Sequence, residues 1–280
     1  HVLVMTATPI PRTLAMTLYG DLDVSILDEL PPQKKPVRTR ILKEAQRSTA
    51  YRIIRDELLQ GRQVFIVYPL VEESEGLELK DATRMADHLA RNVFPEYPVG
   101  LIHGRMRRAE KETVMSHFAA GEIRILVATS VIEVGIDVPG ASLMLIEHAE
   151  RFGLSQLHQL RGRVGRSPIP SQCLLMVGKG GTETSAERLR VMCETNDGFR
   201  IAEADLEARG PGEFLGTRQS GIPAFRVAHI VRDRAILQCA REEALRLLDE
   251  DPLLAQPRHQ ALRRVLLRRW EGGLDLAHTP

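Results

Sequence analysis

Short apolar runs alternate with stretches of helical spacing along most of the chain. The runs are rich in Val and Ile and show no alternation of polar and apolar positions, which is typical of strands buried on both faces of a parallel sheet. Between them, apolar residues recur three and four positions apart, as at Tyr51, Ile54 and Leu58, which predicts helices. Strands joined by helices predict an α/β fold. The predicted strands are Val2–Met5, Val37–Leu42, Val64–Tyr68, Val99–His103, Ile123–Ala128, Leu143–Glu147 and Cys173–Val177.

Two changes in this pattern predict the boundaries of three parts. The segment Asp28–Pro36 (DELPPQKKP) is rich in proline and lysine and is typical of a linker. After about residue 180 the strands stop, and a long helix is predicted from about His229 to Leu248. We therefore expect residues 1–36, 37–180 and 181–280 to be separate parts, the last of them mainly helical. Because the chain opens on a strand-like run without a Met, we expect it to be a fragment.

The composition is that of a chain with a packed core, at 43% hydrophobic and 27% charged residues. The longest apolar stretch, Val64–Val71, is far shorter than the ~20 residues of a membrane span, so no membrane association is expected. The three cysteines are scattered and form no CxxC pair, which favours a reducing, cytoplasmic location. The net charge of +1 argues neither for nor against nucleic acid.

The most specific short pattern is QLRGRVGR at residues 159–166. Its arginines, Arg161, Arg163 and Arg166, are predicted at helical offsets around two glycines, which let another surface approach closely. Guanidinium groups so placed can meet the charge that develops on a transferring γ-phosphoryl group. The alternative is a solvated, arginine-rich helix.

Three further motifs follow predicted strands, where open α/β sheets place their ligands. They are TATPIPRT at residues 6–13, IHGRM at 102–106 and ATSVIEVGIDVP at 128–139. In this order, closing with the arginine motif, they resemble motifs III, IV, V and VI of superfamily 2 helicases. The segment 196–221, NDGFRIAEADLEARGPGEFLGTRQSG, resembles the translocation motif of the RecG family of branch-migration helicases. The resemblance implies a RecA-like parallel sheet, followed by a mainly helical C-terminal region.

The resemblance also implies a nucleotide site. Arg163 and Arg166 match the arginines that reach the ATP phosphates, Gly135 and Asp137 match positions near the nucleotide, and Gln159 matches the polar residue that opens the arginine motif. The carboxylate of Asp137 would accept a hydrogen bond from a ribose hydroxyl.

Nucleic-acid contact and coupling are implied for a second set of residues. Thr6 and Thr8 match the motif that links ATP hydrolysis to unwinding. Thr129 matches a hydroxyl that contacts the nucleic-acid backbone. His103 and Arg105 lie in the motif loop after a predicted strand. For His103, the alternative to nucleic-acid contact is packing at the strand end. Arg188, Arg209 and Gln219 match polar residues of the helical hairpin and loop implicated in translocation. The eight are Thr6, Thr8, His103, Arg105, Thr129, Arg188, Arg209 and Gln219.

Two expected helicase motifs are missing from the sequence. No GxxxxGK[ST] phosphate loop occurs, and Gly178-Lys179-Gly180 is interpreted as a surface turn. No DExH box occurs either, because Asp28-Glu29 lies in the proline-rich linker. The groups that would hold ATP and Mg²⁺ are therefore expected in another lobe, and the chain is expected to be inactive alone. No metal site is expected around Asp137, Glu147 and Glu150.

The leading hypothesis is the C-terminal part of an ATP-dependent DNA helicase that remodels stalled forks and Holliday junctions in recombination and repair. Such a protein would be a monomer at the nucleoid, with DNA and ATP as partners. One alternative is the motor of a transcription-repair coupling factor, and another is a non-catalytic DNA-binding module. The basic stretch 252–270 with Trp270 would bind phosphates or form an ordinary solvated helix.

Overall fold

The computed structural model describes residues 35–69, 75–129, 137–178, 183–209 and 232–269, together with Leu3 and Ser25. From residue 35 onward these form two compact units, one running to Asp205 and the other starting at Leu206. Each unit is described by itself.

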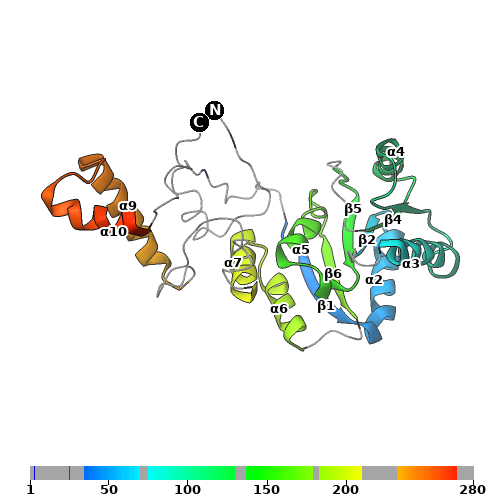
Figure 1. Ribbon diagram of the computed structural model, residues 1–280. Coiled ribbons are helices and arrows are strands. Elements are labelled where there is room, and N and C mark those ends of the chain that lie inside the picture. The colour runs from blue at the N-terminus through cyan, green and yellow to red at the C-terminus, as the bar shows by residue number, and fades with distance from the viewer. Residues whose placement is uncertain are drawn as a thin grey trace. The chain divides into compact units, whose positions relative to one another are not determined.

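The first unit is built on a parallel sheet of six strands in the order β1-β6-β5-β2-β4-β3 (Figure 1). This confirms the predicted α/β fold, and each strand overlaps a predicted run. The run Val2–Met5 lies outside the described residues, apart from Leu3. The strands are β1 (Arg38–Lys43), β2 (Gln63–Tyr68), β3 (Val99–Ile102), β4 (Ile125–Thr129), β5 (Ala141–Ile146) and β6 (Gln172–Val177).

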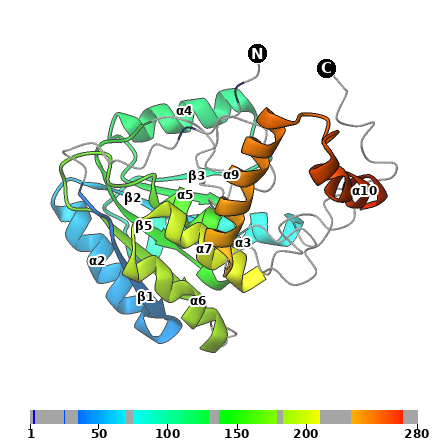
Figure 2. The ribbon, with the colours of Figure 1, turned by 90° about the vertical axis from the view of Figure 1, so that its left-hand side faces the viewer.

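Helices cover both faces of the sheet. One face packs against α2 (Arg47–Leu59), α3 (Glu75–His88) and the π-helical turn η3 (Leu89–Val93). The other face packs against four helices, of which α5, α6 and α7 lie together in Figure 2. These four are α4 (Arg108–Ala119), α5 (Leu154–Arg161), α6 (Glu183–Glu194) and α7 (Gly198–Arg209). Short 3₁₀ turns, η1 (Glu44–Gln46) and η4 (Ala149–Arg151), follow β1 and β5.

Burial on both faces explains the uninterrupted apolar strands. In β2, Val64 and Ile66 belong to the core on the α2 side, while Phe65 and Val67 belong to the opposite core. Phe65 packs edge-on against Phe118 of α4, with ring centroids 4.8 Å apart. Each such side chain, fully removed from water, contributes about 2 kcal/mol to stability. The sheet is therefore a rigid base for the loops at its carboxyl edge.

The second unit is helical in the part that the structure describes. Helix α9 (Arg234–Glu250) is followed by the 3₁₀ turn η5 (Pro257–His259) and by α10 (Gln260–Arg269). The predicted helix from His229 to Leu248 thus begins at Arg234, and residues 229–231 lie outside the described part.

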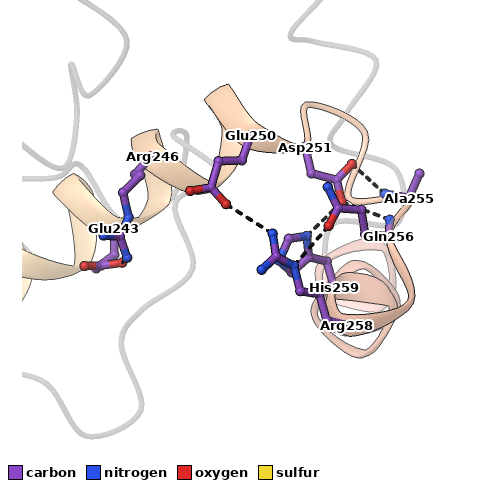
Figure 3. A network of polar contacts seen from close by, with 8 residues as sticks. All are labelled: Glu243, Arg246, Glu250, Asp251, Ala255, Gln256, Arg258 and His259. Carbon is purple, nitrogen blue, oxygen red and sulfur yellow. Dashed lines mark hydrogen bonds and ion pairs between the residues drawn. The ribbon is translucent and has the colours of Figure 1, made fainter.

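Asp251 organises the turn between these two helices (Figure 3). Its carboxylate accepts the backbone N–H groups of Ala255 and Gln256, both at 2.9 Å, and lies 2.8 Å from Nδ1 of His259. The Gln256 amide and the His259 ring hold the pKa of Asp251 below its ordinary value. No helix among the described residues is long and apolar enough to cross a membrane.

Candidate nucleotide and nucleic-acid site

The carboxyl edge of the sheet carries His103 and Thr129, whereas the turn of the arginine motif lies near the amino ends of β1 and β6. His103 directly follows β3 and Thr129 ends β4, and these two strands are neighbours in register, with Ile102 opposite Ala128. Helix α5 follows β5 and leads into the arginine motif. Because all six strands are parallel, their carboxyl ends meet at one edge, where ligands of open α/β sheets bind.

The arginine motif is a helix end followed by a turn. The prediction that its three arginines lie at helical offsets is wrong, because α5 ends at Arg161. Gly165 has a φ of +75°, and a Cβ there would lie 2.7 Å from Cγ2 of Val37. Only glycine fits such a left-handed backbone and so close an approach without strain. Arg163 and Arg166 therefore project from a turn beyond the helix.

Arg161 is a structural residue of the fold. It is 2% exposed and donates from Nη1 to the carbonyl oxygens of Met192 at 2.8 Å and Thr195 at 3.0 Å. The same nitrogen lies 3.3 Å from Oγ1 of Thr39, and Nη2 lies 3.2 Å from Nδ1 of His158. Burial lowers the pKa of Arg161 below the ordinary arginine value. Its guanidinium faces into the protein.

Arg166 lies beside another residue of the predicted nucleotide site. Its Nη1 lies 3.5 Å from Oδ1 of Asp137, which is 29 positions away in the chain, and its Nε donates to the Gly162 carbonyl at 3.2 Å. The Arg166 and Asp137 side chains are 35% and 56% exposed, so a phosphate or ribose can reach them. Arg163 is half-buried and Gln159 is exposed.

His103 and Thr129 present buried polar atoms at the carboxyl edge of the sheet. Nδ1 of His103 and Oγ1 of Thr129 have no hydrogen-bond partner among the residues that the structure describes. Burial and the nearby charge of Lys111 lower the pKa of His103, which favours its neutral ring. Thr129 is 1% exposed, and Arg105 lies exposed in the loop after β3.

A carboxylate from α7 caps the start of α5. Oδ1 of Asp205 accepts the Leu154 backbone N–H at 3.4 Å, and Oδ2 accepts the Ser155 hydroxyl at 3.0 Å. The Gly153 N–H is satisfied separately by the side chain of Gln156 at 3.0 Å. Carboxylates at a helix N-terminus satisfy free N–H groups and favour the helix dipole.

Helix α6 contacts the segment just before α5. Nη2 of Arg188 donates to the carbonyl oxygens of Glu150 at 2.9 Å and Phe152 at 3.0 Å. Together with Arg161 and Asp205, these bonds attach the hairpin of α6 and α7 to both ends of α5. The hairpin therefore holds the element that leads into Arg163 and Arg166.

The acidic residues near this edge have structural partners. Glu147, 1% exposed, accepts from Nη1 of Arg47 at 2.6 Å and from Nη2 at 2.9 Å. The bonds to Glu44 and Glu147 raise the pKa of Arg47 above its ordinary value. Glu150 accepts the Gly178 N–H at 3.2 Å. In the described part of the chain, no three His, Cys, Asp or Glu residues gather as metal ligands would.

Several predicted site residues cannot be placed. Thr6, Thr8, Gly135 and Gln219 lie outside the described residues. Arg209 is the last residue of α7, and only its backbone is described.

Comparison with known families gives the chain two matches. The family described as "Helicase conserved C-terminal domain" matches residues 46–168. The family described as "ATP-dependent DNA helicase RecG, domain 3, C-terminal" matches residues 195–272, which include α7. Curated proteins named ATP-dependent DNA helicase RecG are 52% identical in Synechocystis and 55% identical in Acidithiobacillus ferridurans, each over 97% of this chain. The chain belongs to the RecG family.

A solved RecG structure agrees with this assignment. "Structure of RecG bound to three-way DNA junction" superposes with a TM-score of 0.66 at 49% identity, covering 83% of this chain and 30% of that one. The chain spans about a third of the curated RecG proteins, with 32% of the Synechocystis protein and 38% of the Acidithiobacillus ferridurans protein covered.

Sequence reasoning assigned no role to Asp205, although it lies inside the segment that resembles the RecG translocation motif. A signal was present, since Asp205 falls four positions after Ile201 and three after Ala202, both buried. A carboxylate on the apolar face of a helix needs a partner. The partner, the start of α5, is about 50 residues away in the chain and becomes visible only in the fold.

Proposed function

We propose that this chain is the C-terminal portion of an ATP-dependent DNA helicase that remodels branched DNA. In this proposal residues 1–36 end a first RecA-like lobe, residues 37–180 are the second lobe, and residues 181–280 are the helical region that couples hydrolysis to movement. One observation carries the proposal. The arginine turn follows a helix that the α6–α7 hairpin holds at both ends.

Arg163 and Arg166 are the proposed catalytic residues. Both follow α5, near the amino ends of β1 and β6, and Arg166 is accessible beside Asp137. When the γ-phosphoryl group transfers, negative charge spreads over its oxygens, and guanidinium groups stabilise it. Asp137, with Gly135 and Gln159, would contact the rest of the nucleotide. ATP supplies the free energy for movement along DNA.

The proposal assigns the phosphate loop and the Mg²⁺ ligands to the first lobe. The sequence has no GxxxxGK[ST] motif, and the described residues offer no cluster of metal ligands. The contribution of this chain is therefore to position two arginines across the cleft, which makes hydrolysis depend on the approach of the two lobes.

DNA is the proposed macromolecular partner, in the form of forks and Holliday junctions. The similar solved structure is titled as RecG bound to a three-way DNA junction, which supports this choice. His103, Arg105 and Thr129 would contact the sugar-phosphate backbone, His103 as a neutral hydrogen-bonding group because its pKa is lowered. Thr6, Thr8, Arg188, Arg209 and Gln219 would couple hydrolysis to movement. The protein would act as a monomer in the cytoplasm, at the nucleoid.

Replacement of Arg166 by alanine in the complete protein tests the proposal. We expect ATP turnover in the presence of a three-way junction to fall about 10³-fold, because an arginine finger acts on charge in the transition state. ATP affinity should stay close to that of the wild type. The two measurements are phosphate release and equilibrium binding of a fluorescent ATP analogue. A variant that keeps more than about a tenth of wild-type turnover would show that Arg166 is not at the phosphate.

The same assay addresses the alternative of a non-catalytic DNA-binding module. That alternative predicts no junction-stimulated turnover even in the wild-type protein.

A further inference from the structure

Asp205 is a buried carboxylate with partners on a different element. It is 1% exposed, belongs to α7, and accepts the Leu154 N–H and the Ser155 hydroxyl at the first turn of α5. Burial of a carboxylate is unfavourable unless hydrogen bonds compensate for lost water. These bonds provide that compensation, so the position of α7 and the start of α5 depend on each other.

Helix α5 is short enough to act as one rigid piece. It has eight residues, which corresponds to a length of about 12 Å. Its far end is also bonded to the hairpin, because Arg161 donates to the carbonyl oxygens of Met192 and Thr195. A displacement of the hairpin at Asp205 is therefore carried along α5 to the turn that bears Arg163 and Arg166.

We propose that Asp205 is a positioning residue for the arginine fingers. It sets the placement of α5, and through α5 the reach of Arg163 and Arg166 toward the nucleotide. This inference rests on the proposed function, since it assumes that the two arginines act on ATP. Misplacement of a catalytic group by about 1 Å can lower a rate about 10²-fold. Loss of the Asp205 carboxylate should therefore lower the rate of ATP hydrolysis even in a variant that folds.

The chain offers a matched control for loss of a buried carboxylate. Glu57 on α2 is 5% exposed, accepts the Ser142 hydroxyl at 2.5 Å and accepts from Nη1 of Arg62 at 2.9 Å. Glu57 also accepts from Nε2 of Gln172 at 3.3 Å, and it lies on α2, which covers the face of the sheet opposite α5. Glu57→Ala thus removes a comparable bond to a serine without touching α5.

The experiment compares Asp205→Ala with Glu57→Ala in the complete protein. Steady-state ATP turnover with a three-way junction gives kcat and KM, and thermal melting gives Tm. We expect both variants to melt a few degrees below the wild type. Asp205→Ala should lower kcat at least about 30-fold and leave the KM for ATP within about three-fold, because the fingers act mainly on the transition state. Glu57→Ala should keep kcat within about two-fold of wild type.

A conservative variant should rescue the activity. In Asp205→Asn, the amide oxygen can accept the Leu154 N–H while the amide nitrogen donates to the Ser155 hydroxyl. We expect its kcat to return to within about five-fold of wild type. Equal kcat values for Asp205→Ala and Glu57→Ala would overturn the proposal.

If Asp205→Ala does not fold, Ser155→Ala decides, because it removes one of the two bonds and keeps the cap on Leu154. We expect kcat to fall about three-fold and Tm to fall by a few degrees, and an unchanged kcat would overturn the proposal. Failure of the proposed function would look different, since the wild-type protein itself would then show no junction-stimulated turnover.

Discussion

Arg161, Arg163 and Arg166 carry the same guanidinium group in three different environments. Arg161 is 2% exposed and bonded to the α6 carbonyl oxygens, Arg163 is half-buried, and Arg166 lies beside Asp137 at the surface. The environment, rather than the residue type, therefore decides which arginine supports the fold and which is available to a ligand.

Alanine variants distinguish an arginine that supports the fold from one that acts on a ligand, because replacing the first lowers stability and replacing the second lowers ATP turnover. Arg161→Ala leaves the Met192 and Thr195 carbonyl oxygens without their donor, so we expect a loss of about 2 kcal/mol in unfolding free energy. That loss corresponds to a fall of about 5 °C in Tm. Arg163→Ala should reduce ATP turnover in the complete protein at least about 10²-fold. Thermal melting and phosphate release on the same preparations check both, and a stable, fully active Arg163→Ala would contradict the assignment.

The sequence indicated which arginines belong to the candidate site. It did not indicate which of them is buried in the fold and which is exposed. The sequence singled out residues 159–166, and their contact with ATP stays a prediction. The helical interpretation of this segment failed because α5 ends at Arg161 and the chain then turns at Gly165, whose φ is +75° and which lies close to Val37, just before β1. Asp205 was missed for the same kind of reason, because its partner Ser155 is distant in the chain.

The strands were predictable element by element, whereas contacts between helices were not. Strands such as β2 are buried on both faces, so their apolar runs are continuous and easily recognised. The placement of α6 and α7 against α5 rests on single polar bonds between distant residues, which no local pattern contains. The division of the chain at residues 36 and 180 stays a prediction.

At the scale of elements, we expect Arg188 to matter more for coupling than for hydrolysis. Its bonds to the Glu150 and Phe152 carbonyl oxygens tie α6 to the loop before α5. In the complete protein, Arg188→Ala should keep junction-stimulated ATP turnover within a few-fold and lose branch migration. Arg209→Ala and Gln219→Ala should behave alike. Turnover, junction unwinding and Tm are measured together, and a parallel fall of all three would mean that Arg188 only stabilises the fold.

The turn between α9 and α10 should be acid-sensitive. Hydrogen bonds to the Asp251 carboxylate lower its pKa in the folded chain, so the stability it contributes is full above its unfolded-state pKa of about 3.9. That contribution is lost as the pH falls through the lower folded-state pKa. At pH 7 we expect Asp251→Asn to have a lower Tm than the wild type. Below about pH 3.5 we expect this difference in Tm to disappear. Melting curves by circular dichroism at both pH values check this, and an equal gap at pH 7 and pH 3 would contradict it.

At the scale of the whole molecule, the chain is proposed to supply half of an ATPase site. It holds arginines on a turn beside a RecA-like sheet and a hairpin that positions them. It has no phosphate-loop motif of its own. Hydrolysis would then require a second lobe, and DNA would act by changing how the two lobes meet.

ATP turnover by this chain alone, beside that of the complete protein, tests this claim most directly. Both are measured as phosphate release with a three-way junction present. We predict that the complete protein turns over at an ordinary enzymatic rate, about 1 s⁻¹ or faster, and that the chain alone shows no turnover above background. Turnover above about 1 s⁻¹ by the rigorously purified chain alone would contradict the account, because it would require a phosphate-binding site within these residues.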